Sequence, residues 1–239
     1  MSTPELREMI AEGKAKKIYA TSDPDKLIFY FKDDATAFNA KKRGTIASKG
    51  ILNNRISQHF FRLLETSGIP THFIAEVSER EMLVRRLQII PVETVVRNIV
   101  TGSLQKRLGR TDGEVLAHPV VEFYYKSDAL DDPMINDDHA VVFGWATREE
   151  LAEIRRQALA VNDVLKKFMA EREVLLVDFK LEFGRHHGQI LLGDEICPDT
   201  CRLWDAVTRT KLDKDRFRQD LGGVEEAYHE VHRRVCAAA

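Results

Sequence analysis

Cysteine is scarce in this chain of 239 residues, and that scarcity excludes one class of protein. The three cysteines, Cys197, Cys201 and Cys236, are too few for the disulfide framework of a small secreted domain. Cys197 and Cys201 lie four residues apart with histidines near Cys236, but structural zinc sites normally show two closely spaced ligand pairs. We therefore interpret all three as reduced thiols rather than zinc ligands.

Long hydrophobic runs and an excess of one charge sign are also absent. No apolar run approaches the length of a membrane span, and MSTPELREMIAEG lacks the basic and apolar segments of a secretory signal. The 36 Lys+Arg and 38 Asp+Glu residues leave a formal net charge of -2, which provides no overall field for nucleic acid or an anionic membrane. We expect a cytoplasmic protein with no nucleic-acid or membrane partner, in which local clusters bind any phosphate.

Short apolar runs separated by turn residues organise the first third of the chain. KKIYAT, SDPDK and LIFYFKDD follow this pattern, which is typical of antiparallel hairpins. A helix is predicted from Ser48 to Ser67, and strands are predicted in HFIAEVSER and EMLVRRLQII. We place a boundary near Pro91, so that residues 1–90 form a strand-rich N-terminal lobe.

Residues 91–239 predict a second lobe of the α+β type. PVETVVRNIV favours a strand, and TGSLQKRLG favours a short helix that Ser103 caps at its start and Gly109 ends. Residues 110–146 are predicted as a long loop. Thr147 and Glu150 form a capping box for an amphipathic helix, two strands follow in VLLVDFKLEF and QILLGDEI, and a final helix is interrupted at Gly222-Gly223.

The strand LVDFKLEFG carries three ionisable groups in one row. Asp178, Lys180 and Glu182 alternate with Phe179, Leu181 and Phe183, so the two sets face opposite sides. A solvated polar face is one interpretation, but the apolar runs around the row indicate a strand covered on both faces. If Glu182 pairs with Asp194, the two carboxylates face each other and predict a Mg²⁺ site, whereas a slip of one residue turns Asp194 away.

Four further clusters could bind anions or nucleotides. Gly13 with the following lysines could cradle a polyphosphate, although lysines at strand edges also serve to prevent unwanted pairing. Arg97 interrupts an apolar strand just before Ser103 at a predicted helix start, which would suit a phosphate. The acidic run that begins at Lys126 and contains Asp132 is either a plain solvated loop or a nucleotide contact. Arg202 precedes an apolar Leu-Trp pair and is a second possible clamp.

Taken in order and spacing, several segments resemble one family. EGKAKKIY, KDDATAFNAKK, PVETVVRNIVTGSLQKRLG, FYYKSDALDDPM, LVDFKLEFG, GDEICPDTCRLWD and LDKDRFRQDLGG are similar to the SAICAR synthetases of purine biosynthesis. The likeness spans nearly the whole chain. Asn39 and Cys201 stand where part of the family has Asp and many members have Ser.

The resemblance implies an activity and a fold. The expected enzyme is an ATP-dependent ligase that joins L-aspartate to the carboxylate of 5-amino-1-(5-phosphoribosyl)imidazole-4-carboxylate (CAIR), giving SAICAR, ADP and phosphate, with Mg²⁺ as cofactor. The expected fold is two-lobed and α+β, with mainly antiparallel sheets, related to ATP-grasp and kinase-like nucleotide folds. The resemblance also implies a homodimer and small-molecule substrates only.

The family's roles can be assigned to individual residues of this sequence. The implied ATP-binding residues are Lys14, Ala15, Lys16, Ile89, Lys126 and Glu182. The implied substrate-binding residues are Arg97, Ser103, Asp132, Lys180 and Arg202. The catalytic assignment is Lys180, Glu182 and Asp178, with Asp178 as a base for the incoming amine, and the metal assignment is Glu182 and Asp194.

Two other functions fit part of the sequence. A small-molecule or protein kinase would also use lysines and paired acids, but the chain has neither an HRDxxxxN loop nor a DFG motif, which argues against the protein-kinase form. A GxxxxGK[ST] phosphate loop is absent as well. A non-catalytic nucleotide-sensing module is the third possibility.

Overall fold

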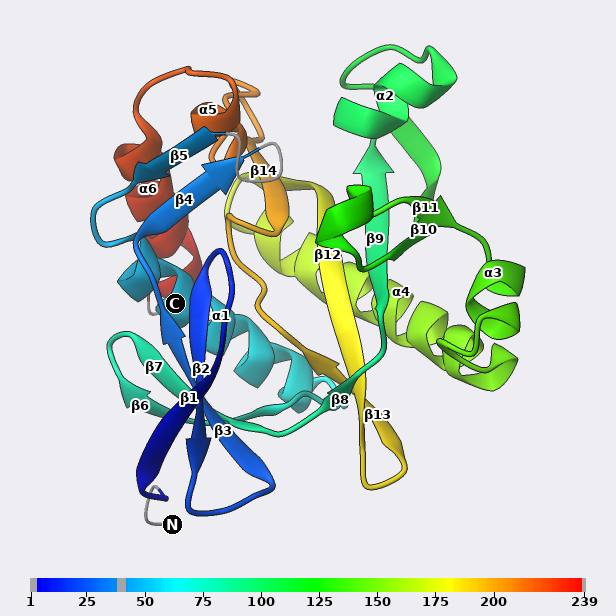
Figure 1. Ribbon diagram of the computed structural model, residues 1–239. Helices are drawn as coiled ribbons and strands as arrows, with labels where there is room; N and C mark the ends of the chain where they lie inside the picture. Colours follow the sequence, from blue (N-terminus) through cyan, green and yellow to red (C-terminus); the bar gives the residue numbers. More distant parts are fainter. Residues whose placement is uncertain (1–3, 38–41, 238–239) are drawn as a thin grey trace.

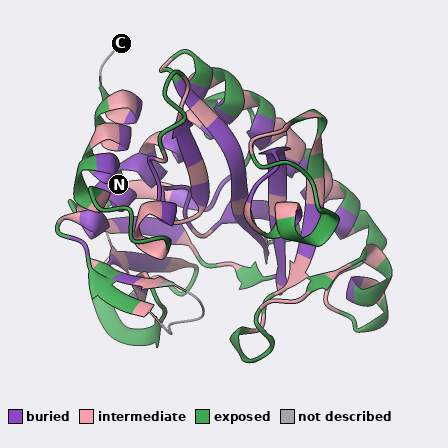
Figure 2. Cartoon of the chain, turned by 90° about the horizontal axis from the view of Figure 1, so that it is seen from above, coloured by how far each residue is buried: buried purple, intermediate pink, exposed green. Residues whose placement is uncertain are grey.

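The structure is a computed structural model, and it describes residues 4–37 and 42–237. Asn39 lies outside these residues. Figure 1 shows two sheets side by side, each backed by a long helix. Figure 2 shows that the strands in the middle of the molecule are buried, whereas the outer faces of the helices and the loops are exposed.

The first sheet has five antiparallel strands in the order β1-β2-β3-β7-β6. Their bounds are β1 (Leu6–Glu12), β2 (Lys16–Thr21), β3 (Lys26–Phe31), β7 (Glu81–Arg85) and β6 (Phe73–Ser78). The predicted helix is α1 (Lys49–Thr66), which begins directly after Ser48 and buries Leu52, Ile56, Phe60 and Leu64 on one side. A separate hairpin joins β4 (Asp34–Ala37) to β5 (Lys42–Thr45).

The second sheet has seven strands, and its main path runs β11-β10-β9-β12-β13. Its strands are β8 (Gln88–Ile89), β9 (Val92–Ile99), β10 (Val115–Tyr125), β11 (Met134–Ile135), β12 (Val174–His186), β13 (Gln189–Gly193) and β14 (Cys201–Asp205). Both β8 and β14 pair with β12. The helix α4 (Arg148–Ala170) packs along β12, and its start has the predicted capping box of Thr147 and Glu150.

Two predictions for residues 101–146 are wrong. Residues 110–146 are no plain loop, because they contain β10, β11, the 3-10 turn η1 (Asp128–Leu130) and the helix α3 (Asp137–Val142). The pairing of β10 with β9 is irregular between Val115 and Val120, where Pro119 has no backbone N–H to donate. The Ser103 cap is also wrong, because Thr101 is the N-cap of α2 (Gly102–Leu108), whereas Gly109 ends that helix as predicted.

The last two helices that the structure describes pack on elements from the first third of the chain. The helices α5 (Asp215–Arg218) and α6 (Val224–Cys236) are separated by a stretch that contains Gly222 and Gly223, as the sequence predicts. Contacts between α6 and α1 are extensive, and Tyr228 is buried with Ala35, Ile46 and Leu52. One large apolar cluster extends through both sheets. The boundary between residues 1–90 and 91–239 stays a prediction.

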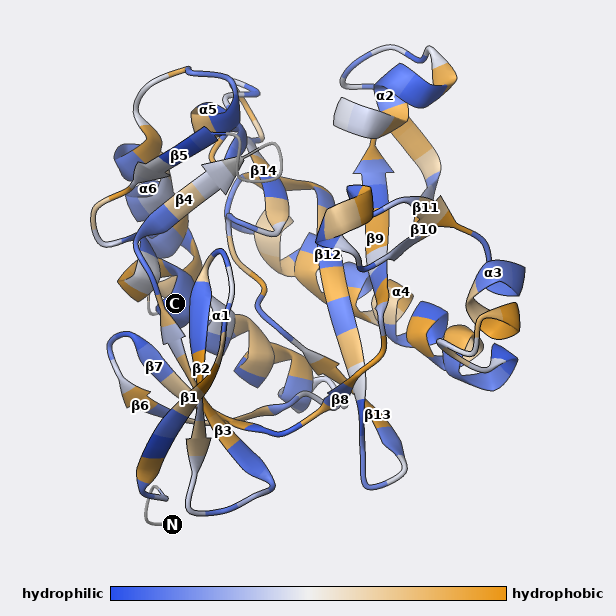
Figure 3. Ribbon diagram, viewed as in Figure 1, coloured by the Kyte–Doolittle hydropathy of each residue, from blue (hydrophilic) through white to orange (hydrophobic). Residues whose placement is uncertain are grey.

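The strand β12 positions the polar row. Figure 3 shows hydrophilic and hydrophobic residues alternating along it. Asp178 and Glu182 are buried on one side, and Phe179, Leu181 and Phe183 are buried on the other, so the interpretation of a strand covered on both faces is confirmed. Of the two registers that the sequence left open, the structure has the one slipped by a residue, because Glu182 pairs with Gly193 rather than with Asp194.

Candidate active site

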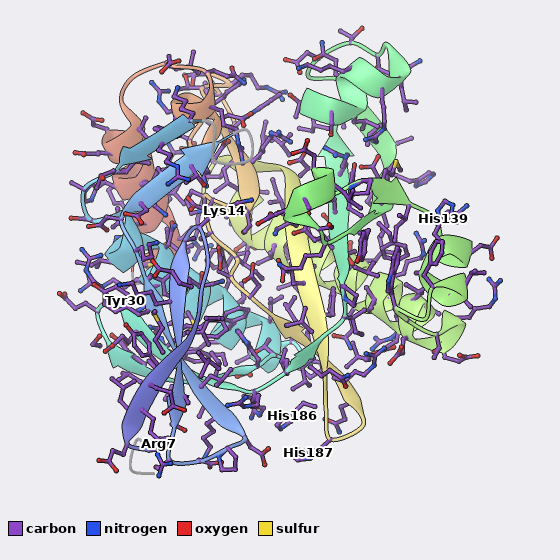
Figure 4. All side chains as sticks on the ribbon, viewed as in Figure 1. Arg7, Lys14, Tyr30, His139, His186 and His187 are labelled. Carbon is purple, nitrogen blue, oxygen red and sulfur yellow. The ribbon has the colours of Figure 1, made fainter. Side chains whose placement is uncertain are left out.

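A single cavity collects every site residue predicted from the sequence. It has a volume of about 1330 Å³, larger than the space that one small ligand usually occupies. Its lining includes Lys14, Ala15, Lys16, Ile89, Arg97, Ser103, Lys126, Asp132, Asp178, Lys180, Glu182, Asp194 and Arg202. Figure 4 marks Lys14 at the tip of the β1–β2 hairpin and His186 and His187 at the β12–β13 turn, which also line the cavity.

Lys180 lies at the centre of a cluster of buried carboxylates. Its Nζ donates to Glu93 Oε1 at 2.7 Å and to Glu182 Oε1 at 3.0 Å. Lys126 also donates to Glu182. Burial acts to lower the pKa of Lys180, but the charges of Glu182, Asp194 and Glu93 outweigh it and hold that pKa above its ordinary value. Lys180 is therefore a permanent cation at the centre of the cavity.

Asp194 enters this cluster through the backbone rather than through strand pairing. It follows the last residue of β13 and has a left-handed backbone with φ 59°. Lys16 from β2 forms ion pairs with both Asp194 and Glu195, so the two sheets meet here. Burial acts to raise the pKa of Asp194, but Lys16, Lys180 and Lys126 hold it well below its usual range. The carboxylate is therefore ionised throughout the neutral range.

A second cluster, rich in arginine, forms another part of the cavity wall. Arg97 Nη1 donates to Asp178 Oδ2 at 2.7 Å, and Arg97 Nη2 donates to Ser103 Oγ at 3.0 Å. Arg202 Nη1 donates to Asp178 Oδ2 at 2.9 Å, and its Nε donates to Asp215 Oδ2 at 3.0 Å. Because both guanidinium groups bind the Asp178 carboxylate, that residue holds them side by side.

The remaining predicted residues lie on loops and at strand ends around the cavity. Lys14 Nζ forms an ion pair with Asp128 Oδ1 at 2.7 Å. Asp132 Oδ1 accepts a hydrogen bond from the Ser127 backbone N–H at 2.8 Å and thereby closes the turn that carries Asp128. Ile89 in β8 is paired with Gly184 and keeps 41% of its surface exposed.

The carboxylates of the lysine-rich cluster fit a nucleotide-bound Mg²⁺ better than a metal held by protein alone. Among residues 4–37 and 42–237, no three His, Cys, Asp or Glu side chains are grouped closely enough to bind a metal ion. Glu182 and Asp194 nonetheless both line the cavity beside the same lysine. Mg²⁺ is commonly bound by one or two carboxylates together with substrate phosphates. The donor set therefore fits that ion.

Two acids of this cluster are missing from the predictions. Glu93 is buried, and although Lys180 lowers its pKa, burial is the larger effect and raises it. Glu195 is also buried and pairs with Lys16. Strand alternation could have identified Glu93, because residues 93, 95 and 97 share one face of a strand and Arg97 is a predicted site residue. Glu195 adjoins Asp194 in GDEI and carries no comparable signal.

Comparison with known proteins decides the family. A family model described as SAICAR synthetase matches residues 9–235. The chain belongs to the SAICAR synthetase family. A phosphoribosylaminoimidazole-succinocarboxamide synthase of Chlorobium limicola is 62% identical over 227 residues, covering 95% of this chain and 96% of that protein. The family and the α+β fold predicted from the sequence motifs are thereby confirmed.

Solved structures of SAICAR synthetases have the same fold. The enzyme from Ehrlichia chaffeensis superposes with a TM-score of 0.94 at 47% identity, covering 97% of this chain and 100% of that one. A SAICAR synthetase in complex with ADP superposes with a TM-score of 0.92 at 50% identity, covering 97% of each chain. In the part of the chain that the structure describes, no helix is long and apolar enough to cross a membrane.

Proposed function

We propose that the cavity binds ATP, CAIR and L-aspartate together and carries out the family's reaction with the residues assigned above. The chain is an ATP-dependent ligase of purine biosynthesis by family membership, joining L-aspartate to CAIR. A carboxylate at neutral pH resists attack by an amine, because it would have to expel an oxide. Transfer of the γ-phosphoryl group of ATP to CAIR gives an acyl phosphate, from which phosphate leaves as the aspartate amine attacks.

We assign the nucleotide to the side of the cavity formed by the first sheet and β8. A relative of similar fold is known as a complex with ADP, which supports nucleotide binding in this cavity. Ile89 is exposed on β8 and can pack on the adenine. We assign the polyphosphate to Lys14 and Ala15 in the β1–β2 turn, together with Lys16 and Lys126. Its negative charges would replace the carboxylates that now pair with these three lysines.

We assign the ribonucleotide to the arginine-rich side. Arg97 and Arg202 share Asp178, and Arg97 also contacts the Ser103 hydroxyl; these groups together form a donor set that suits a phosphate. Asp178 holds the two arginines in place. Its further role as the base for the aspartate amine stays a prediction, as does a substrate contact from Asp132.

Lys180 would neutralise the charge that develops between the two sides. Its position between Glu93 and Glu182, in reach of the field of Asp194, is the single observation that carries this proposal. A preorganised cation acts on the transferring phosphoryl group without reorganising at the moment of reaction. Glu182 and Asp194 would hold Mg²⁺ on the phosphates, and bound Mg²⁺ would supply further neutralisation of the polyphosphate charge.

An assay of ADP release with each substrate omitted in turn tests the function. The ligase releases ADP continuously only when ATP, CAIR and L-aspartate are all present. Continuous release without L-aspartate would identify a kinase instead. Binding of ATP with no turnover under any combination would identify a nucleotide-sensing module.

The cytoplasmic location and the homodimer remain proposals. Light scattering on the purified protein would give the mass of the particle in solution. A mass equal to one chain at assay concentration would contradict the homodimer.

A further inference from the structure

His72 is a buried imidazole that none of the roles above uses. It lies directly before β6, lines the active-site cavity and keeps only 1% of its surface exposed. Its ring makes edge contacts with Phe29 at 5.4 Å and Phe61 at 5.2 Å between centroids. Burial first, and then the charge of Lys16, lowers the pKa of His72 to about 3, so the ring is neutral.

The backbone around His72 joins the first lobe to the end of β13. The His72 N–H donates to the Leu192 carbonyl at 2.8 Å, and the Leu192 N–H donates to the Pro70 carbonyl at 3.1 Å. Thr71 and Leu192 form a parallel bridge between these bonds. This junction therefore ends two residues before Asp194.

The His72 side chain continues the junction toward Asp194. The backbone of Asp194 acts to raise the pKa of His72, which is the direction expected when a carbonyl lies near an imidazole N–H. Nδ1 faces this turn, because it would lie 3.7 Å from a Cβ placed on Gly193, whereas Nε2 is buried without a hydrogen-bond partner in the described structure. A neutral imidazole has one N–H to donate, and this geometry directs it to the turn.

His72 is also connected to Lys16 through a shared ring. Lys16 Nζ lies over the Phe29 ring at 5.1 Å from its centroid, and the His72 ring packs edge-on against that same phenylalanine. Displacing the imidazole would therefore affect both the Asp194 turn and the support of the lysine that pairs with it.

We propose that His72 is a positioning residue that holds the left-handed Asp194 turn and the Phe29 support of Lys16, so that both groups are oriented for a nucleotide and its cation. The inference rests on the proposed function. It differs from a plain core role, because a core residue would stabilise the fold without affecting how strongly Mg²⁺ promotes nucleotide binding.

The test compares three variants with the wild type by calorimetric titration of ADP with and without Mg²⁺. His72→Phe retains a ring but has no N–H, and His72→Gln retains a donor. We expect His72→Phe to weaken ADP binding about tenfold in Mg²⁺, the lower end of what outer-shell partners of metal ligands contribute, and much less without it. His72→Gln should restore most of the Mg²⁺ effect.

The third variant, Phe73→Leu, is the packing control. Phe73 is buried and stacks on Phe61, but it does not line the cavity. The Phe73→Leu substitution should lower the midpoint of thermal unfolding and leave the effect of Mg²⁺ on ADP binding unchanged. If the larger ring of His72→Phe prevents folding, His72→Leu replaces it in the same comparison.

Two results would overturn the inference in different ways. The first result requires wild-type protein that binds ADP and is active. If Mg²⁺ then promotes ADP binding by His72→Phe or His72→Leu as strongly as by wild type, His72 only fills the core. Wild-type protein that binds no ADP would refute the proposed function itself, and this inference with it.

Discussion

The cations of the site are already paired with acids before any substrate is bound. Lys180 pairs with Glu93 and Glu182, and Lys16 pairs with Asp194 and Glu195. Arg97 and Arg202 share Asp178. When a polyanionic substrate binds, its charges would therefore replace these carboxylates as the partners of the lysines and arginines.

Replacing Lys180 by Met should affect catalysis more than binding. We expect kcat to fall by about 10²–10³, because one preorganised cation is lost, while the affinity for ADP changes only a few-fold. Steady-state ADP release and calorimetric titration measure the two quantities. Lys26→Met is the matched control, since Lys26 pairs with Asp23 outside the cavity. A kcat within a few-fold of wild type would remove Lys180 from the mechanism.

Most individual site residues could be predicted because family motifs and strand alternation name them directly. All the predicted residues line one cavity, although their roles are still proposals. Glu93 was missed because an acid between β-branched residues was interpreted as part of an ordinary strand. What the sequence does not contain is the set of partners, such as Asp215 for Arg202, because these depend on how distant segments pack.

At the scale of elements, the long helices were predicted better than the strand pairing. The amphipathic pattern and the capping box of α4 are local signals, and both are confirmed. The register of β12 with β13 is fixed by the turn at His187 and Gly188 and by the packing of both faces, which alternation alone does not specify. Asp194 reaches the site through a left-handed backbone beyond the strand end, which no periodic pattern encodes.

The capping box of α4 offers a direct test of element stability. Thr147 Oγ1 accepts a hydrogen bond from the Glu150 N–H at 3.2 Å, and Glu150 accepts one from the Thr147 N–H at 2.9 Å. Thr147→Ala should lower the free energy of unfolding by about 1 kcal/mol. Urea titration measures it, with the exposed Thr111→Ala as control. Equal midpoints for the two variants would contradict a stabilising cap.

At the scale of the whole molecule, a buried ionic network connects elements that are distant in sequence. Asp199 lies between β13 and β14 and accepts from Lys49 Nζ in α1 at 2.8 Å and from the Tyr228 hydroxyl in α6 at 2.6 Å. Lys214 Nζ approaches it at 3.4 Å. Burial acts to raise the pKa of Asp199, but Lys214 and Lys49 outweigh it and hold that pKa well below its usual range.

The stability contributed by this network should depend on pH. Because the pKa of Asp199 is depressed on folding, its contribution is fully present above the unfolded value of about 4 and declines progressively as pH falls from there toward the lower folded value. Asp199→Asn should lower the free energy of unfolding by about 3–5 kcal/mol at pH 7, since two lysines lose their buried counter-charge.

Urea titrations at neutral pH and below pH 4 check both parts of this prediction. The difference between wild type and Asp199→Asn should shrink in acid, because proton uptake by Asp199 in the unfolded chain then lowers the stability of wild type but not that of the variant. Asp138→Asn breaks an exposed pair with Arg148 and serves as control, with little expected change. A difference independent of pH would show that the Asp199 charge does not stabilise the fold.

The packing of α6 on α1 also has a consequence for the order of folding. The small cluster of Tyr228 with Ala35, Ile46 and Leu52 stays incomplete until the ribosome has made α6. Hairpins such as β2–β3 and β6–β7 need only neighbouring residues and can form early, whereas contacts between distant segments form late. During synthesis, part of α1 therefore stays uncovered until α6, the last described helix, has been made.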